Sequence, residues 1–314
     1  NIFVENASIV DISSEGKSVA KVDGMVIFVD GGVPGDIADV MITRKKNNYA
    51  EGHITALKSP SPNRIEPKCE HFGSCGGCKW QNMNYETQLF FKQKTVEDAL
   101  TRIGKLDISS LKPIFPNKVN YFYRNKLEFS FSDKKWLTSE EIKSGVEIDN
   151  RNALGFHIPK MFDKILDIKN CYLQEEPSNS IRNEIRDFAN NHNMTFFGVR
   201  DKTGLLRSLM IRSSSNGELM VLIQFFEDDK QNRELLLDHL YDKFPQITSL
   251  QYVINSKAND TLYDTNIKLY KGRDYILEEM EGLKFSINAK SFYQTNSDQA
   301  YELYKITRDF AGLT

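Results

Sequence analysis

Short apolar runs separated by glycine turns make up the first sixty residues. Apolar and polar positions alternate within five stretches, residues 6–12, 17–23, 24–31, 36–45 and 49–58. Glycines and the dipeptide Pro34-Gly35 lie between them. Period-two alternation with regular turn signals is typical of the short strands of a small barrel. The pattern therefore predicts a small five-stranded β-barrel over residues 1–60.

The pattern changes to a helical one after a proline-rich stretch, residues 59–67. From Tyr85 to Ile103 apolar residues recur at helical spacing, and Gly104 is a typical C-terminal stop. We expect the buried side of this helix to carry Leu89, Val96, Leu100 and Ile103.

Strands and helices are mixed in the rest of the chain. Strand patterns occupy residues 123–131, 207–213, 218–226, 250–255 and 267–272, and amphipathic helices occupy 178–192 and 232–244. These elements predict a mixed α/β central domain with a largely antiparallel sheet. The predicted domains are the barrel (1–60), a linker and cysteine loop (61–83), the central domain (84–284) and a final segment (285–314).

The final segment ends in a helix, residues 297–313, with Ser297 as a candidate N-cap. One face of this helix is apolar and needs a cover; it carries Ala300, Leu303, Tyr304, Thr307 and Phe310. We interpret residues 285–314 as the start of a truncated domain. The expected fold class is therefore multi-domain, with the rest of a C-terminal domain missing from the chain.

Composition adds little to this picture. The chain has 314 residues, 40% hydrophobic and 27% charged, as in an ordinary globular protein of several domains. No apolar run reaches the length of a membrane span, and the N-terminus has neither a cationic leader nor an initiator methionine. We expect no membrane association, a cytoplasmic location and a chain trimmed from a longer one.

The charge is uneven along the chain. Residues 61–135 hold 13 Lys/Arg against 8 Asp/Glu, whereas the chain as a whole has a net charge of −2. A local positive field attracts a phosphate-bearing partner. A solvated lysine-rich surface explains the same excess equally well.

Three of the four cysteines lie in one short loop, "CEHFGSCGGCKWQ" (69–81), at Cys69, Cys75 and Cys78. Cys171 follows Cys78 after a gap of 92 residues. Disulfides are disfavoured without an oxidising compartment, and structural zinc usually has two Cys-x2-Cys pairs. A 4Fe-4S cluster suits the pattern better, because one loop can bind three corners and a remote cysteine the fourth. Zinc remains open.

The cysteine loop and the following Y-x2-Q-x3-K (85–92) resemble the signature of the RNA (uracil-5-)-methyltransferases. The branch in question acts on 23S ribosomal RNA and carries a TRAM domain and a 4Fe-4S cluster. Similar stretches occur at residues 123–131, 155–174 and 285–304. The resemblance implies that the predicted barrel is an OB-like TRAM domain and that Cys69, Cys75, Cys78 and Cys171 bind the cluster. It also implies that the missing C-terminal domain is a doubly wound methyltransferase domain.

The resemblance also implies the reaction. In this family a cysteine thiolate attacks C6 of a uracil, and C5 then takes a methyl group from S-adenosyl-L-methionine. The segment "SFYQTN" (291–296) is similar to the one that reaches the active site. It implies that Phe292 contacts the extruded uracil and Gln294 the methyl donor.

No catalytic residue is assigned within the chain. If all four cysteines bind the cluster, none remains as nucleophile, and the glycines never form a G-x-G-x-x-G loop. We expect the nucleophile and the base to lie beyond Thr314, and the chain by itself to be inactive.

RNA contacts are expected at two basic groups, with no protein partner implied. Around the cysteine loop they are Lys79, Arg124 and Lys126; at a barrel strand end they are Arg44, Lys45 and Lys46. A solvated hairpin tip explains the basic residues Arg44, Lys45 and Lys46 equally well. The alternative function is a noncatalytic iron-sulfur or zinc-stabilised RNA-binding protein.

Overall fold

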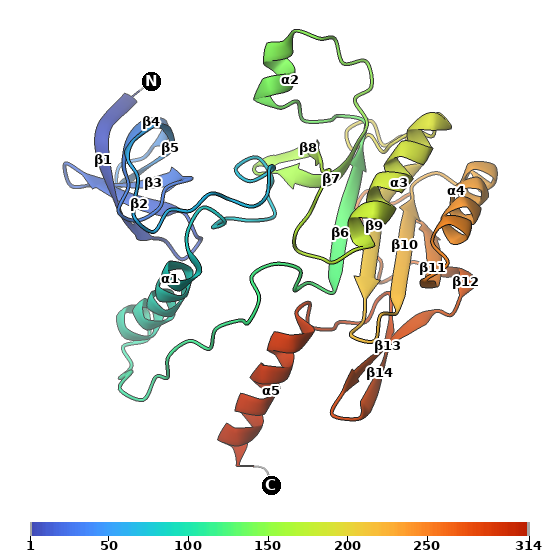
Figure 1. Ribbon diagram of the computed structural model, residues 1–314. Helices are drawn as coiled ribbons and strands as arrows, with labels where there is room; N and C mark the ends of the chain where they lie inside the picture. Colours follow the sequence, from blue (N-terminus) through green and yellow to red (C-terminus); the bar gives the residue numbers. More distant parts are fainter. Residues whose placement is uncertain (1, 313–314) are drawn as a thin grey trace. The chain divides into compact units, whose positions relative to one another are not determined.

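The computed structural model describes residues 2–312 (Figure 1). The chain divides into two compact units, residues 1–118 and 119–314. No helix among the described residues has the length and the apolar character that a membrane crossing requires. The predicted boundaries at residues 60, 83 and 284 remain predictions.

A closed five-stranded barrel begins the first unit, as its alternating pattern predicts. Its strands are β1 (Ile2–Ile12), β2 (Ser18–Val22), β3 (Met25–Asp30), β4 (Ile37–Lys45) and β5 (Tyr49–Ser59), in the order β1-β2-β3-β5-β4. Only β3 and β5 pair in parallel. The interior is filled by small and β-branched side chains, among them Ala20, Val29, Val40 and Ala50. Closure leaves no sheet edge unpaired.

Asp36 joins the barrel to the segment that follows it. Its carboxylate is buried and accepts hydrogen bonds from the Val33 N–H at 2.7 Å and the Ser61 N–H at 2.8 Å. The Arg64 guanidinium donates to both carboxylate oxygens, at 3.1 and 2.5 Å. A buried carboxylate is stable only when its oxygens are satisfied in this way. Asp36 therefore fixes the exit from the barrel.

The helix of the first unit has the predicted extent but buries a different side. Helix α1 (Tyr85–Asp98) continues as a π-helical turn, η1 (Ala99–Ile103). Phe91 is its buried residue and packs with Ile12 and Met83, whereas Val96 is 48% and Ile103 84% exposed. The predicted apolar side was wrong because Phe91, on the opposite side of the helix, fills the space next to the barrel.

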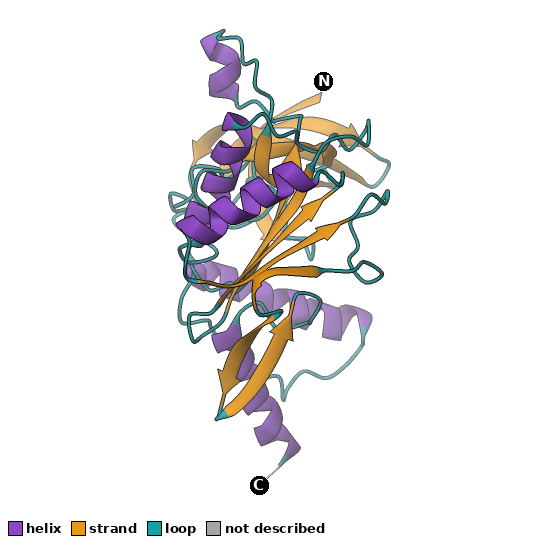
Figure 2. Ribbon diagram, turned by 90° about the vertical axis from the view of Figure 1, so that its right-hand side faces the viewer, coloured by secondary structure: helices purple, strands orange, loops and turns teal. Residues whose placement is uncertain are grey.

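A seven-stranded sheet forms the body of the second unit (Figure 2). Its order is β12-β11-β10-β9-β6-β7-β8, and only β10 and β11 pair in parallel. The strands are β6 (Lys126–Ser132), β7 (Ala153–Ile158), β8 (Met161–Asp167), β9 (Leu206–Ser213), β10 (Leu219–Phe225), β11 (Ile247–Ile254) and β12 (Lys268–Gly272).

Two helices cover one face of this sheet, α3 (Ser178–Asn191) and α4 (Lys230–Lys243) (Figure 2). Both bury apolar residues at helical spacing, Ile181 and Ile185 in α3, Leu236 and Leu240 in α4. Helix α4 connects the parallel strands β10 and β11, as such a pair requires. A short helix, α2 (Ser139–Ser144), lies between β6 and β7 in the sequence.

A β-hairpin also packs against the sheet. The strand residues that it contacts alternate along the strands with those buried beneath α3 and α4. It consists of β13 (Tyr275–Met280) and β14 (Leu283–Asn288). Its Ile276 and Ile287 share an apolar cluster with Met210, Met220 and Leu222. Successive strand residues point to opposite faces. The hairpin therefore lies on the face that α3 and α4 leave open.

Helix α5 (Ser297–Ala311) follows the hairpin. Its N-cap is Asn296, which accepts a hydrogen bond from the Gln299 N–H at 3.1 Å, and the predicted cap Ser297 is the first helical residue. Of the predicted apolar face only Ala300 is buried; Leu303 is 51% and Phe310 77% exposed.

Replacing Asp36 by alanine should destabilise the first unit by about 3 kcal/mol, because two buried N–H groups and the Arg64 guanidinium lose their acceptor. Urea unfolding monitored by barrel fluorescence or circular dichroism measures the change. Glu5→Ala, at an exposed position of β1, is the control and should change stability by less than about 0.5 kcal/mol. Equal stability of the two variants would contradict the role given to Asp36.

Candidate functional site

The connection between β14 and α5, residues 289–296, contains both predicted active-site residues. Asn125, just before β6, holds it from the sheet. The Asn125 main-chain N–H donates to the Thr295 carbonyl at 2.8 Å, and its side-chain amide donates to the Gln294 carbonyl and the Ser297 hydroxyl, each at 2.8 Å. Gln294 is therefore positioned through its backbone, which leaves its side-chain amide available for a ligand.

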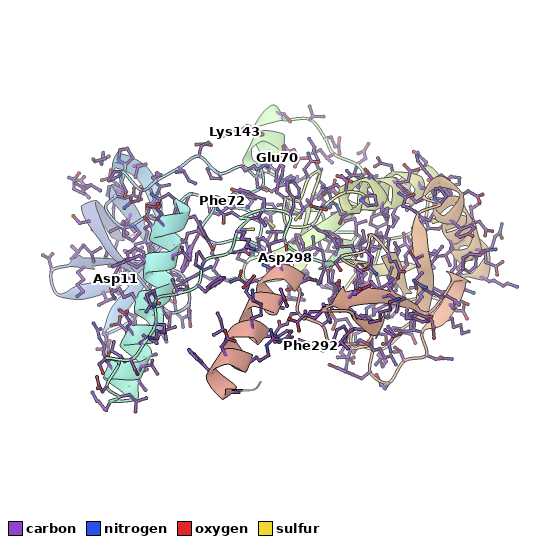
Figure 3. All side chains as sticks on the ribbon, turned by 60° about the horizontal axis from the view of Figure 1, so that its bottom comes forward. Asp11, Glu70, Phe72, Lys143, Phe292 and Asp298 are labelled. Atoms are coloured by element: carbon purple, nitrogen blue, oxygen red, sulfur yellow. The ribbon has the colours of Figure 1, made fainter. Side chains whose placement is uncertain are left out.

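Arg212 of β9 holds the beginning of the same connection. Its side chain is buried and donates to the Asn288 carbonyl at 3.1 Å and to the Ser291 carbonyl at 3.0 Å. Phe292, the next residue, is 86% exposed. In Figure 3, Phe292 and Asp298 mark the connection and the first turn of α5. A rigid backbone thus presents an aromatic ring to solvent.

Unsatisfied buried polar atoms gather at this connection. Within the described residues, no partner is found for the Tyr293 hydroxyl, the Arg124 Nε, the Asn125 Oδ1 or the Arg212 Nε. Burial, assisted by the negative charge of Glu278, raises the pKa of Tyr293 to about 12. Tyr293 is therefore a protonated donor at neutral pH. Buried polar groups without partners are rare and typically mark a place where a ligand or water binds.

A buried carboxylate connects the hairpin to α5. Glu278 of β13 is 1% exposed. It accepts hydrogen bonds from the Ser215 N–H at 3.0 Å and the Ser297 hydroxyl at 3.2 Å, and a further one from the Ser215 hydroxyl. These donors satisfy the buried charge and join three segments around the candidate site.

The two predicted basic residues of the second unit differ in surroundings. The Arg124 main-chain N–H donates to the Leu173 carbonyl at 2.8 Å, and its Nε is one of the unsatisfied atoms. The Lys126 Nζ lies 2.6 Å from the Glu128 carboxylate. Arg124 thus has unused donor capacity beside Asn125, whereas the charge of Lys126 is partly neutralised.

The cysteine loop belongs to the first unit and directs backbone N–H groups at its sulfurs. The His71 and Phe72 N–H groups bond to the Cys69 sulfur, and the Gly77 N–H donates to the Cys75 Sγ at 3.3 Å. Burial, with a contribution from Cys78, raises the pKa of the Cys69 thiol. N–H groups aimed at sulfur are typical of protein-bound iron-sulfur clusters.

Cys171, in the second unit, is held by Asn179 of α3. The Cys171 N–H donates to the Asn179 Oδ1 at 2.8 Å, and the Asn179 amide returns a bond to the Cys171 carbonyl at 3.2 Å. Arg182 donates to the same Oδ1 at 2.9 Å. Within the described residues, no three His, Cys, Asp or Glu side chains are grouped so that they could hold a metal ion. The surroundings of the sulfurs in the cysteine loop suit a cluster.

The basic residues of the first unit are partly engaged. The Lys79 Nζ donates to the Glu15 carbonyl at 2.6 Å, and the Arg44 guanidinium lies 3.8 Å from the Glu51 carboxylate. Lys46 lies over the Tyr49 ring at 5.4 Å. Lys45 is exposed at the end of β4. Arg44, Lys45 and Lys46 thus lie at the tip of the β4–β5 hairpin, where long cationic side chains can reach a phosphate backbone.

Known proteins match both the barrel and the whole chain. Residues 4–55 match the TRAM domain model. An uncharacterized RNA methyltransferase of Bacteroides thetaiotaomicron is 52% identical over 96% of this chain and 67% of its own length. One of Porphyromonas gingivalis is 51% identical over 98% of this chain and 67% of its own length.

A solved structure is similar in fold. It is the Pyrococcus abyssi tRNA (uracil-54, C5)-methyltransferase in complex with S-adenosyl-L-homocysteine, with a TM-score of 0.69 and 22% identity. The match covers 97% of this chain and 64% of that one. The fold and the relatives together define an RNA-modifying protein with a TRAM domain. The chain belongs to the family of these RNA methyltransferases.

These matches correct the fold class predicted from the sequence, in which a C-terminal doubly wound methyltransferase domain is missing. RNA methyltransferases align with 96–97% of this chain, so nearly all of it is methyltransferase sequence. The prediction rested on the uncovered face of α5, and an apolar face indicates a contact surface without saying what covers it. The expectation that the chain is inactive gains no support from the matches either.

Several residues of the site were not found from the sequence. Asn125, Arg212, Glu278 and Tyr293 act through contacts between segments that are far apart in the chain, which no local pattern reveals. Asn125 and Tyr293 lie in stretches similar to the family, residues 123–131 and "SFYQTN", but the similarity assigns a role to neither.

Asn125→Ala should loosen the connection at residues 289–296, because three main-chain and side-chain acceptors depend on this residue and two of its bonds come from the removed amide. We expect amide hydrogen exchange in residues 290–297 to become about tenfold faster. Mass spectrometry of exchanged peptides measures the effect. Asn216→Ala, in an exposed turn, is the control. Unchanged protection in Asn125→Ala would show that Arg212 alone suffices.

Proposed function

We propose that this protein transfers a methyl group from S-adenosyl-L-methionine to C5 of a uridine in RNA. The family supports RNA methylation, and the similar solved structure is that of a uracil C5-methyltransferase with S-adenosyl-L-homocysteine. The observation that carries the proposal is the fixed connection that exposes Phe292 next to Gln294 and Tyr293.

The three side chains have complementary roles toward an extruded uracil. Phe292 stacks on the base after it has left the RNA, which compensates part of the lost stacking. Gln294 offers both a donor and an acceptor for the base edge or the methyl donor. Tyr293, protonated at neutral pH, supplies a further donor. S-adenosyl-L-methionine supplies the methyl group. We assign the nucleophile and the base to none of the described residues.

The substrate in this proposal is 23S ribosomal RNA. The TRAM domain, with Arg44, Lys45 and Lys46 at its hairpin tip, holds the RNA backbone. Lys79, Arg124 and Lys126 add contacts to phosphate or sugar. Arg124 is the strongest candidate among these residues, because its buried Nε has unused hydrogen-bonding capacity.

A 4Fe-4S cluster on Cys69, Cys75, Cys78 and Cys171 is the second part of the proposal. The cysteine spacing and the N–H groups directed at the Cys69 and Cys75 sulfurs support it. Its role is structural: it would fix the cysteine loop and the Cys171 segment, and no reaction step uses it.

Phe292→Ala should lower kcat/KM for methylation of 23S ribosomal RNA by about 30-fold, because stacking on the extruded base is worth about 1–3 kcal/mol. Methyl transfer from labelled S-adenosyl-L-methionine by the purified protein measures it. Phe162→Ala, another exposed phenylalanine (65%), is the control. A transfer RNA transcript tests the substrate: preferential methylation of that RNA would refute the ribosomal assignment and leave the reaction intact.

Cys171→Ser should abolish stable cluster binding, because a serine hydroxyl is a far poorer iron ligand than a thiolate. Iron and sulfide analysis of anaerobically purified protein, with the visible spectrum, gives the cluster content. If the purified protein contains zinc and no iron, the four cysteines form a structural zinc site and the cluster proposal is refuted. Full iron and sulfide content in Cys171→Ser would remove this residue from the ligand set.

A further inference from the structure

A cavity of about 450 Å³ opens on the face of the sheet that α3 and α4 leave uncovered. Strands β6, β9 and β10 form its floor, and residues 260–263 together with Lys290 form one wall. Apolar side chains line part of it, among them Met210, Leu222 and Leu262. A volume of this size and a mixed lining are typical of a site for one small organic molecule.

The floor contains a buried hydrogen-bond acceptor without a partner. Gln224 of β10 is 2% exposed and lines the cavity. Its Nε2 donates to the Asp260 carbonyl at 3.2 Å. This contact sets the orientation of the side-chain amide, because the amide oxygen of Gln224 has no hydrogen to donate to that carbonyl. Within the described residues, no partner is found for the Gln224 Oε1. The cavity therefore calls for a ligand that brings a donor.

Two cations hold the loop that forms the wall. Arg207 of β9 donates to the carbonyls of Asn255 and Lys257 at 2.7 and 2.8 Å. The Lys290 Nζ donates to the carbonyls of Tyr263 and Thr265 at 3.1 and 2.6 Å. The loop is thus fixed at both ends by side chains of the sheet and of the 289–296 connection. The cavity is preformed.

The charges at the cavity are balanced. Lys126 and Lys290 are cationic, and Glu128 and Asp260 are anionic. Lys126 also pairs with Glu128. A balanced rim does not select an anion such as free phosphate. The Tyr263 ring, 87% exposed, lies at the cavity and offers a surface for stacking.

We propose that this cavity binds one unstacked nucleobase of the RNA substrate, at a nucleotide other than the methylated uridine. The base lies against the apolar lining, donates an imino or amino N–H to the Gln224 Oε1 and stacks on Tyr263. The proposal rests on the proposed function in that it assigns the ligand to the same RNA. Its consequence is that the enzyme recognises a second nucleotide by its base.

Ligand-observed NMR with AMP, CMP, GMP and UMP tests the pocket directly. We expect saturable binding of at least one nucleotide, weakened about tenfold in Gln224→Met, which keeps the size of the side chain and removes the acceptor. Gln251→Met is the matched control: Gln251 is 3% exposed in β11, but its amide bonds to Ser249 and to the Asp274 carbonyl. Tyr263→Ala, in an exposed loop, weakens binding without endangering the fold.

Each outcome has one reading. Loss of binding in Gln224→Met and Tyr263→Ala but not in Gln251→Met supports the pocket. Absence of saturable binding by all four nucleotides, or equal binding by Gln224→Met, overturns it. If the protein methylates RNA but binds none of the four nucleotides, the proposed base-binding pocket is refuted and the proposed function stands. Nucleotide binding without methylation would defeat the proposed function and leave a base-binding pocket.

Discussion

The backbone between β14 and α5 is held by hydrogen bonds from two side chains of the central sheet, Asn125 and Arg212. Every feature of the candidate site depends on this attachment. An exposed aromatic ring such as Phe292 would otherwise lose conformational entropy whenever it met a base. Because its backbone is already fixed, much of that cost is met on folding, and stacking contributes more fully to recognition.

Local patterns were sufficient for much of the fold. The five barrel strands were predicted, because closed barrels alternate apolar and polar residues along every strand. Helices α3 and α4 were predicted to within two residues at each end. Strands β7, β8, β13 and β14 were not assigned. Strand β8 and most of β7 and β14 lie in stretches noted only for similarity to a family, and the polar–apolar alternation of β14 was overlooked.

The candidate site was only partly predictable. Phe292 and Gln294 came from the similarity of one short segment, and their attachment came from residues up to 170 positions away. Such long-range hydrogen bonds have no sequence period. The uncovered face of α5 was misread for a related reason: burial of α1 and α5 is decided by what packs next to them, as Phe91 shows in α1. Charge patterns predicted where basic residues lie but not that Lys79 and Lys126 are already engaged.

The link from Ser215 through Glu278 to Ser297 has a mechanical consequence. The Glu278 carboxylate of β13 bonds both to the turn after β9 and to the first residue of α5. If one of these three segments shifts alone, the buried carboxylate loses a hydrogen bond that stabilises its charge. A force applied to α5 is thus transmitted to the sheet as a rigid displacement and not absorbed by the intervening loop.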